Sequence, residues 1–167
     1  MPTANKIVDS DITVKKIGKP FIDSSKLTDL SDFFQQGRNN PDILIENIDT
    51  SNVTNMSNMF NGCTKLTEVW IKNIKVNLQV GSGTSWGHLL TVDSLVHLCQ
   101  ELVNVGSSKT LTVGSANLEK LASVYVKLTV PEAEDTTGKL PCEVCESTGE
   151  GAMLIEDYIA LKHWQLA

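Results

Sequence analysis

The chain has 167 residues, with 14 Lys and Arg against 20 Asp and Glu and a formal net charge of −6. An apolar fraction of 41% in a chain of this length supports one globular domain and excludes a disordered chain. The acidic balance argues against nucleic-acid binding, which needs clustered Lys and Arg, and no stretch approaches the ~20 apolar residues of a membrane span. We therefore expect no nucleic-acid partner and no membrane span.

Residues 1–21 precede the repeat described below. Apolar residues such as Ile12 and Val14 alternate there with charged ones, which predicts an edge strand over the first repeat or an arm that docks on another subunit. The first residues carry no apolar signal core and no small-residue cleavage site, so we expect no secretion through a signal peptide.

Residues 22–34 align without a gap over residues 48–60, at an offset of 26 residues. The register continues into residues 43–45 over residues 69–71. Identical pairs in this alignment include Asp23 and Asp49, Ser25 and Ser51, Thr28 and Thr54, Ser31 and Ser57, and Phe34 and Phe60. Two copies in phase over a full period predict a repeat architecture.

Each repeat unit is predicted to contain a short helix, a turn and a strand. Residues 50–52 offer side-chain oxygens to the start of the helix, and Gly62 is placed to end it. The run of residues 69–71 is β-branched and aromatic, as in a strand. The residues at helical spacing, which form one apolar stripe, are Val53, Met56, Met59 and Phe60. Since one unit cannot bury its apolar side alone, we expect an α/β fold of stacked helix-strand units with parallel strands.

Residues 49–67 read Asp-Thr-Ser-Asn-Val-Thr-Asn-Met-Ser-Asn-Met-Phe-Asn-Gly-Cys-Thr-Lys-Leu-Thr. This segment resembles the BspA-type leucine-rich repeat of bacterial surface proteins, which runs Asp-Thr-Ser-Asn-Val-Thr-x-Met-x-x-Met-Phe, then Gly-Cys and x-x-Leu-Thr. The first copy has residues 37–41 in place of the Gly-Cys pair, as an N-terminal capping unit would. The resemblance implies a short leucine-rich-repeat-like solenoid of about four or five units over residues 22–128.

Residues 80–88 form a glycine-rich stretch that contains Trp86. It lacks the Gly-Lys-Ser/Thr ending of a phosphate-binding P-loop, so we interpret it as a connector. Trp86 is predicted to be either a lid over the end of the core or an exposed contact residue.

The second half keeps the alternation of helices and strands. Residues 90–103 predict an amphipathic helix capped by Thr91, residues 109–113 predict a strand, and Ser115 begins another helix. This block resembles cap-like repeats in tail-associated and other structural proteins of bacteriophages. In those repeats a last helix leads to a terminal strand with Trp, which implies a C-terminal capping helix and strand at residues 153–167. His163 stands where that family usually has Gly.

Residues 129–152 are predicted to form an acidic loop with a Cys-x-x-Cys pair, Cys142 and Cys145. A structural zinc site needs four ligands and no second pair exists, while a redox pair would favour a helix start without acidic neighbours such as Glu143. We retain the two thiols as weak metal or redox candidates, interpret them as buried or incidental cysteines, and expect no cofactor.

Asp93, His97 and Glu101 fall on one stripe of the predicted helix at 90–103. Two carboxylates and an imidazole could bind a divalent metal, but a solvated helix face with weak pairing is the commoner explanation and the one we adopt. No Ser-His-Asp order, nucleophile elbow or paired-carboxylate motif occurs, so we expect no enzymatic activity.

The expected function is that of a non-catalytic structural or attachment component of a bacteriophage virion, in a fibre, in the tail or on the capsid. Its partners would be other virion proteins or a host-surface protein or glycan, and the chain could form a homo-oligomer. One alternative is a bacterial cell-surface adhesin, and another is a small metal or redox protein that uses Cys142 and Cys145. The candidate binding residues are Asn52, Asn55, Asn58, Trp70 and Trp86.

Overall fold

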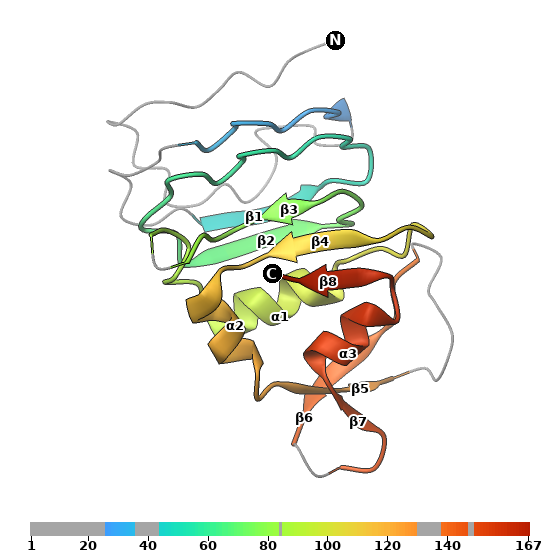
Figure 1. The fold of residues 1–167 in the computed structure, drawn as a ribbon. Helices are drawn as coiled ribbons and strands as arrows, with labels where there is room; N and C mark the ends of the chain where they lie inside the picture. The colour runs from blue at the N-terminus through green and yellow to red at the C-terminus, as the bar shows by residue number, and fades with distance from the viewer. Residues whose placement is uncertain (1–25, 36–43, 84, 130–137, 147–148) are drawn as a thin grey trace.

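The computed structural model describes residues 26–35, 44–83, 85–129, 138–146 and 149–167 (Figure 1). The predicted arm at residues 1–21 lies outside these ranges. The helices are α1 (Val92–Gln100), α2 (Ser115–Leu121) and α3 (Ile155–Ala160). The strands are β1 (Leu44–Asp49), β2 (Glu68–Lys72), β3 (Leu78–Gln79), β4 (Lys109–Thr112), β5 (Tyr125–Leu128), β6 (Cys142–Cys145), β7 (Ala152–Leu154) and β8 (Trp164–Leu166).

The strands form three small sheets. β1 pairs with β2 in parallel, and β3, β4 and β8 form a second parallel sheet in that order. β5 is the central strand of an antiparallel sheet with β6 and β7 at its sides. Figure 1 shows the parallel strands and the repeat segments before them as successive rows, with the antiparallel sheet at the opposite end of the molecule.

Backbone hydrogen bonds join the two repeat copies directly. The amides of Leu30, Asp32 and Phe34 donate to the carbonyl oxygens of residues 55, 57 and 59, each across 2.9 Å. Because these carbonyls accept from the first copy, they are not available for bonds within a helix. Asn58 has a positive φ of 55°, which also ends helical geometry. Residues 53–60 are therefore extended and turned, and the predicted short helix is wrong.

The buried stripe of this segment is nevertheless the predicted one. Val53, Met56, Met59 and Phe60 are all buried. The Phe60 ring stacks on Phe34 of the first copy, with centroids 5.8 Å apart and an interplanar angle of 2°. The hydroxyl of Thr50 donates to the carbonyl oxygens of Lys72 and Asn73 rather than capping a helix. Equivalent side chains of the two copies thus pack against each other in one continuous core.

The predicted helix near residue 90 is confirmed as α1, which begins after Thr91. The hydroxyl of Thr91 accepts a hydrogen bond from the Ser94 amide across 3.2 Å, as an N-cap does. The strand predicted at residues 109–113 is confirmed as β4, and α2 begins at Ser115 as expected. The N-cap of α2 is Gly114, and no side chain among the described residues caps this helix.

The C-terminal part differs from the predicted division, because two strands, β6 and β7, pair with β5 there, and β7 crosses the predicted boundary at residues 152 and 153. Residues 142–145 form β6, which pairs with β5, so these residues are not part of a loop. A boundary after residue 128 would separate two hydrogen-bonded strands of one sheet. α3 and β8 follow, and His163 between them has a φ of 62°. This turn thus forms with a histidine in the left-handed region, a conformation that glycine adopts at less cost.

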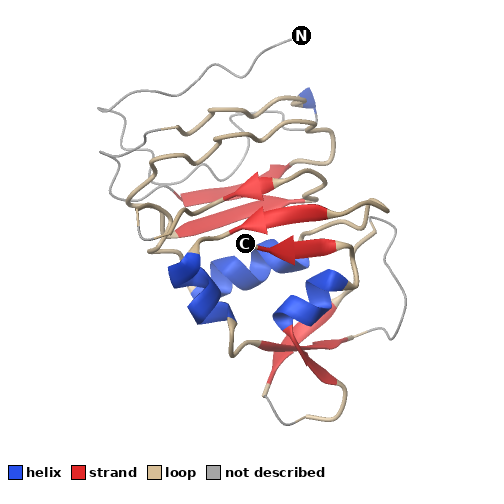
Figure 2. Cartoon of the chain, in the orientation of Figure 1, coloured by secondary structure: helices blue, strands red, loops and turns tan. Residues whose placement is uncertain are grey.

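The three helices lie between the parallel strands and the antiparallel sheet (Figure 2). α1 contacts β2, while α3 contacts β8 on one side and β5 and β7 on the other. Within the described ranges, no helix combines the length and the apolar character needed to cross a membrane.

Candidate functional site

A groove of about 320 Å³ opens between the second repeat copy and strands β3 and β4. Within the described part of the chain, no backbone hydrogen bond joins residues 56–58 to β3, so the ladder between successive rows is interrupted there. Three segments far apart in the sequence line this polar groove; its residues are Met56, Ser57, Asn58, Asn77, Leu78, Gln79, Thr110 and Thr112.

The polar groove is uncharged, with an apolar base. Met56 and Leu78 are buried, whereas the other lining residues carry hydroxyl or amide groups and are partly or fully exposed. The Asn77 side-chain oxygen accepts from the Thr110 amide across 2.9 Å, which fixes β4 beside this segment. Hydroxyls and amides beside apolar surface suit a neutral polar ligand, such as a glycan or the backbone of a protein loop.

Of the predicted binding residues, the structure brings only Asn58 into the polar groove. Asn52 is exposed outside it, and Asn55 accepts hydrogen bonds from the amide and hydroxyl of Ser57 in a local turn. The half-buried Trp70 donates its indole N–H to Glu68 across 2.9 Å, and its ring lies 4.7 Å from that of His97. These side chains do not form one site.

Trp86 has only 7% of its surface exposed, so its role as an exposed contact residue is wrong. The glycine-rich stretch around it packs tightly. A Cβ on Gly81 would lie 2.1 Å from the Val113 oxygen, and one on Gly87 would lie 2.0 Å from the Val80 oxygen. Only glycine permits such backbone approaches, so the stretch is a packed connector that holds Trp86 against the core.

The sequence interpretation missed the polar residues of the groove outside the repeat copy. Thr110 and Thr112 flank buried Leu111, and Gln79 lies between buried Leu78 and Val80. This alternation places the polar side chains on the outer face of their strands. This alternation could be predicted from the sequence. The position of Asn58 beside these strands could not, because it depends on how the successive rows stack.

The stripe of Asp93, His97 and Glu101 is not a solvated face. His97 Nε2 lies 3.0 Å from the Ile71 oxygen, and Glu101 accepts from the Asn73 amide across 3.0 Å. Burial lowers the pKa of His97, and the attraction of Glu101 opposes this only in part. Side chains of α1 and of its C-cap thus satisfy backbone groups along β2. The prediction of a solvated helix face is therefore wrong for His97 and Glu101. Asp93 is exposed, as that prediction expects.

The four cysteines, all of which lie in the described ranges, form no disulfide bond with one another. Cys142 and Cys145 are half-buried on β6, and no group of three or more His, Cys, Asp or Glu residues in the described ranges is arranged to hold a metal ion. Burial raises the pKa of Cys142, and the Gln100 side chain and the positive charge of Lys162 counter this only in part. Burial also raises the pKa of Cys99 to about 12, so both groups stay protonated at neutral pH.

Lys162 lies at the centre of a buried polar cluster. Its side chain has 0% exposure, and its ammonium donates to the Cys99 oxygen at 2.8 Å and to the Tyr158 hydroxyl at 2.9 Å. The Tyr158 hydroxyl in turn donates to the Leu140 oxygen across 2.6 Å. Burial lowers the pKa of Lys162 to about 8. Because its partners are main-chain carbonyls and a neighbouring hydroxyl, this cluster joins α3 to the end of α1.

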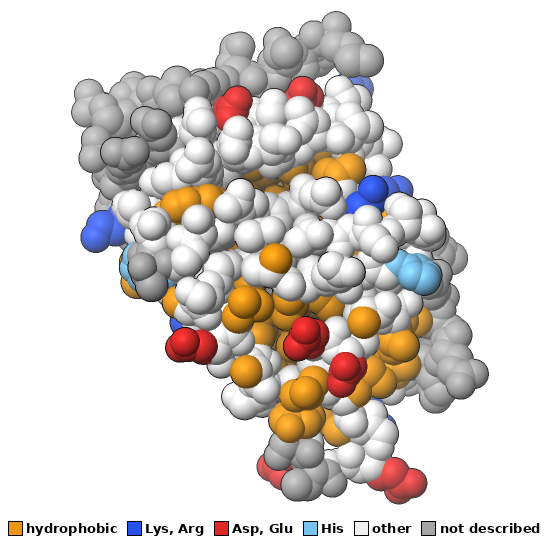
Figure 3. Space-filling view, viewed as in Figure 1, with side chains coloured by type: hydrophobic (Ala, Val, Ile, Leu, Met, Phe, Trp, Pro, Cys, Tyr) orange, Lys and Arg blue, Asp and Glu red, His pale blue; other side chains and the backbone are white. Residues whose placement is uncertain are grey.

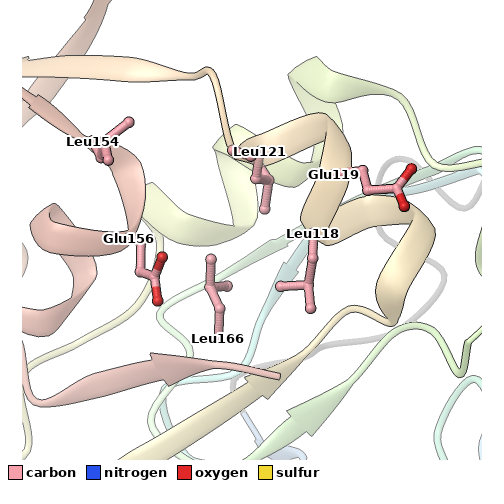
Figure 4. Close-up of a pocket in the computed structure, with 7 residues that line it drawn as sticks. Leu118, Glu119, Leu121, Leu154, Glu156 and Leu166 are labelled. Carbon is pink, nitrogen blue, oxygen red and sulfur yellow. The ribbon is translucent and has the colours of Figure 1, made fainter.

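A second groove, of about 400 Å³, lies between α2, α3 and β8. Figure 4 shows Leu118, Leu121 and Leu166 pointing into it, with Leu154 at one end and Glu156 and Glu119 at its margin. On this face of the molecule, hydrophobic side chains gather with acidic ones beside them (Figure 3). We call this the apolar groove; it is lined by Leu118, Glu119, Leu121, Ala122, Leu154, Glu156 and Leu166.

Comparison with known proteins gives one family. No curated protein and no solved structure matches the chain. Residues 7–80, which contain both repeat copies, match the family described as "Mycoplasma protein of unknown function, DUF285", a domain known in BspA-like repeat proteins.

Proposed function

We propose that this chain is a non-catalytic repeat protein that recognises another macromolecule through the polar groove. The observation that carries this proposal is the convergence of uncharged hydroxyl and amide groups from three successive rows on one groove with an apolar base. Such surfaces give specificity through hydrogen bonds and do not require a cofactor.

The proposal includes a short leucine-rich-repeat-like solenoid. It is supported by the direct hydrogen bonds between the two repeat copies and by the parallel order of β3, β4 and β8. In a solenoid each unit contacts only its neighbours, and side chains of adjacent units form an extended binding surface. The polar groove has this property, since its residues come from adjacent rows.

The chemistry of the described side chains supports a catalytic role less well than it supports a binding role. Nucleophilic cysteines need a lowered pKa, whereas burial raises the pKa of Cys99 and Cys142. The imidazole of His97 contacts a backbone carbonyl, and the Lys162 ammonium is enclosed by protein groups. These groups have structural partners and are poorly placed to meet a substrate.

The setting that we propose is a bacteriophage virion, where the chain would contact neighbouring virion proteins or the host surface. Its support is the resemblance of residues 90–121 and 158–167 to repeats of bacteriophage structural proteins. The alternative is a bacterial cell surface, which the family match of residues 7–80 favours through BspA-like repeat proteins.

Binding assays with groove variants test this function. Asn58→Gly keeps the positive φ and removes the amide, and Thr110→Lys places a long charged side chain in the polar groove. We expect the wild type to be retained by purified virion proteins or bacterial envelope, and both variants to bind about tenfold more weakly. Ser107→Lys, in an exposed loop, is the matched control and should bind like the wild type.

Two results would overturn the proposal. The wild type could bind neither virion proteins, nor envelope, nor a glycan array, or both groove variants could bind as tightly as the wild type. Light scattering on the same samples gives the oligomeric state and shows whether a variant has lost the native assembly.

A further inference from the structure

The apolar groove lies at the open edge of a parallel sheet. β8 is the last strand in the order β3, β4, β8, so one of its edges has no strand partner among the described residues. The Lys109 amide donates to the His163 oxygen, and the Ala167 amide donates to the Leu111 oxygen. Since backbone groups alternate along a strand, the amides and carbonyls of Trp164 and Leu166 face away from β4. Trp164 is buried, so the half-exposed Leu166 is the residue that offers its backbone groups at this edge.

The same edge borders apolar surface. Leu166 follows buried Trp164 by two residues, so both side chains lie on the face of β8 toward the helices. Leu166 remains half-exposed and lines the apolar groove together with Leu118 of α2. A strand added to β8 would therefore place every second side chain between α2 and α3, over leucine surface.

The charge around the apolar groove has one sign. Among the residues that the structure describes, its lining contains the exposed carboxylates of Glu119 and Glu156 and no Lys, Arg or His. A bound segment with Lys or Arg beside its apolar residues would be attracted electrostatically to the carboxylates of Glu119 and Glu156. A second copy of this chain that docked through the same groove would bring four carboxylates together, and each chain already has a net charge of −6.

We propose that the apolar groove is a docking site for an extended segment of a partner protein, which adds as a strand to β8 and carries a basic residue beside its apolar side chains. Backbone hydrogen bonds to the half-exposed Leu166 would supply affinity, while the leucine surface and the two glutamates would supply specificity. This site is separate from the polar groove, and it does not depend on the function proposed for that surface.

An array of randomised ten-residue peptides tests the proposal with the full chain. We expect the bound peptides to be enriched in Lys or Arg beside Val, Ile or Leu, and depleted in Pro, Asp and Glu. The double variant Glu119→Lys/Glu156→Lys reverses the charge at exposed positions, and it should bind these peptides at least about tenfold more weakly. Its matched control is Glu143→Lys/Glu150→Lys, which reverses two exposed carboxylates outside the groove.

N-methylated peptides test the strand geometry separately. Only every second amide of an added strand faces β8, so methylation of one alternate set should abolish binding and methylation of the other set should not. The polar-groove variant Thr110→Lys should bind the peptides like the wild type, which separates this proposal from the previous one.

Several results would overturn the docking proposal. The first is an array in which no peptide binds, or in which binding is the same for the wild type and the Glu119→Lys/Glu156→Lys variant. Equal effects of the two methylation sets would exclude strand addition. A wild-type dimer that becomes tighter when Glu119 and Glu156 are both neutralised to Gln would show that a second copy occupies the groove instead, because neutralisation removes the repulsion between the four carboxylates.

Discussion

The Lys162 ammonium lies 2.8 Å from the main-chain oxygen of Cys99, in the last turn of α1. The last carbonyls of a helix have no partners within the helix, and its dipole places partial negative charge there. A lysine from the segment after α3 supplies both a hydrogen-bond donor and a positive charge at this end. Two elements about 60 residues apart in the sequence are thereby joined inside the core.

The pKa of Lys162 makes stability depend on pH. It is about 8 in the folded chain, below the ordinary 10.5, so between these values the unfolded chain binds more protons than the folded one. Stability therefore rises with pH across this window. Relative to Lys162→Met, we expect the wild type to gain about 2 kcal/mol in free energy of unfolding between pH 7.5 and 9.5.

Urea denaturation at several pH values measures this difference. Lys127→Met, at an exposed position, serves as the control and should follow the wild type at every pH. A constant difference between the wild type and Lys162→Met would mean that the lysine keeps an ordinary pKa when buried.

Ser94→Ala should destabilise the fold by about 1–3 kcal/mol. The Ser94 hydroxyl accepts from the Val69 amide at 2.8 Å and donates to the Val69 oxygen at 3.2 Å, and all three groups are buried. Alanine leaves both backbone groups of β2 without a partner. Chemical denaturation measures the loss, and Ser107→Ala in an exposed loop should leave stability unchanged. Equal stability of the two variants would refute a structural role for this hydroxyl.

Gly81→Ala should strongly destabilise the fold. The new Cβ would lie 2.1 Å from the Val113 oxygen, so the backbone of the row would have to move. Gly106→Ala is the comparison, because its Cβ would meet nothing within 4 Å and only its positive φ of 69° opposes alanine. We expect a loss of about 1 kcal/mol at Gly106 and several times more at Gly81, measured as shifts in thermal unfolding.

His163→Gly should stabilise the chain slightly, by up to about 1 kcal/mol. His163 is exposed and has a φ of 62°, a conformation that costs an L-residue free energy and costs glycine little. The greater freedom of glycine in the unfolded chain offsets part of the gain. Differential scanning calorimetry gives the result, and a lowered melting temperature would show that the imidazole makes a contact that outweighs the backbone strain.

The sequence predicted best those features that are determined by neighbouring residues within one segment. The apolar stripe around Met56, the cap at Thr91 and the strand at residues 109–112 could all be derived from spacing and residue type. The predicted helix at residues 53–60 failed because the carbonyls of this segment bond to the first repeat copy. Residue spacing in one segment cannot reveal such bonds between segments.

The candidate binding surfaces were harder to derive. Asn58 was predicted as a contact residue, yet its neighbours in the polar groove, Gln79 and Thr110, come from rows that follow much later in the sequence. For Trp86, burial contradicts only the alternative of an exposed contact residue, since the flanking glycines permit close approach of backbones. His97 and Glu101 were predicted to lie on a solvated helix face, whereas they contact backbone groups of Ile71 in β2 and of Asn73 just after it.

By itself, the sequence determined the 26-residue repeat, the apolar residues that each unit buries and the acidic, aromatic-poor character of the chain. These features follow from local spacing and composition. Only the tertiary structure decided that the repeat copies join through backbone hydrogen bonds, that Lys162 closes the end of α1, and that two grooves open at interrupted or terminal strand edges. The reason is physical: a backbone group or a buried charge is satisfied by whichever segment the fold brings near it, and that partner lies far away in the sequence.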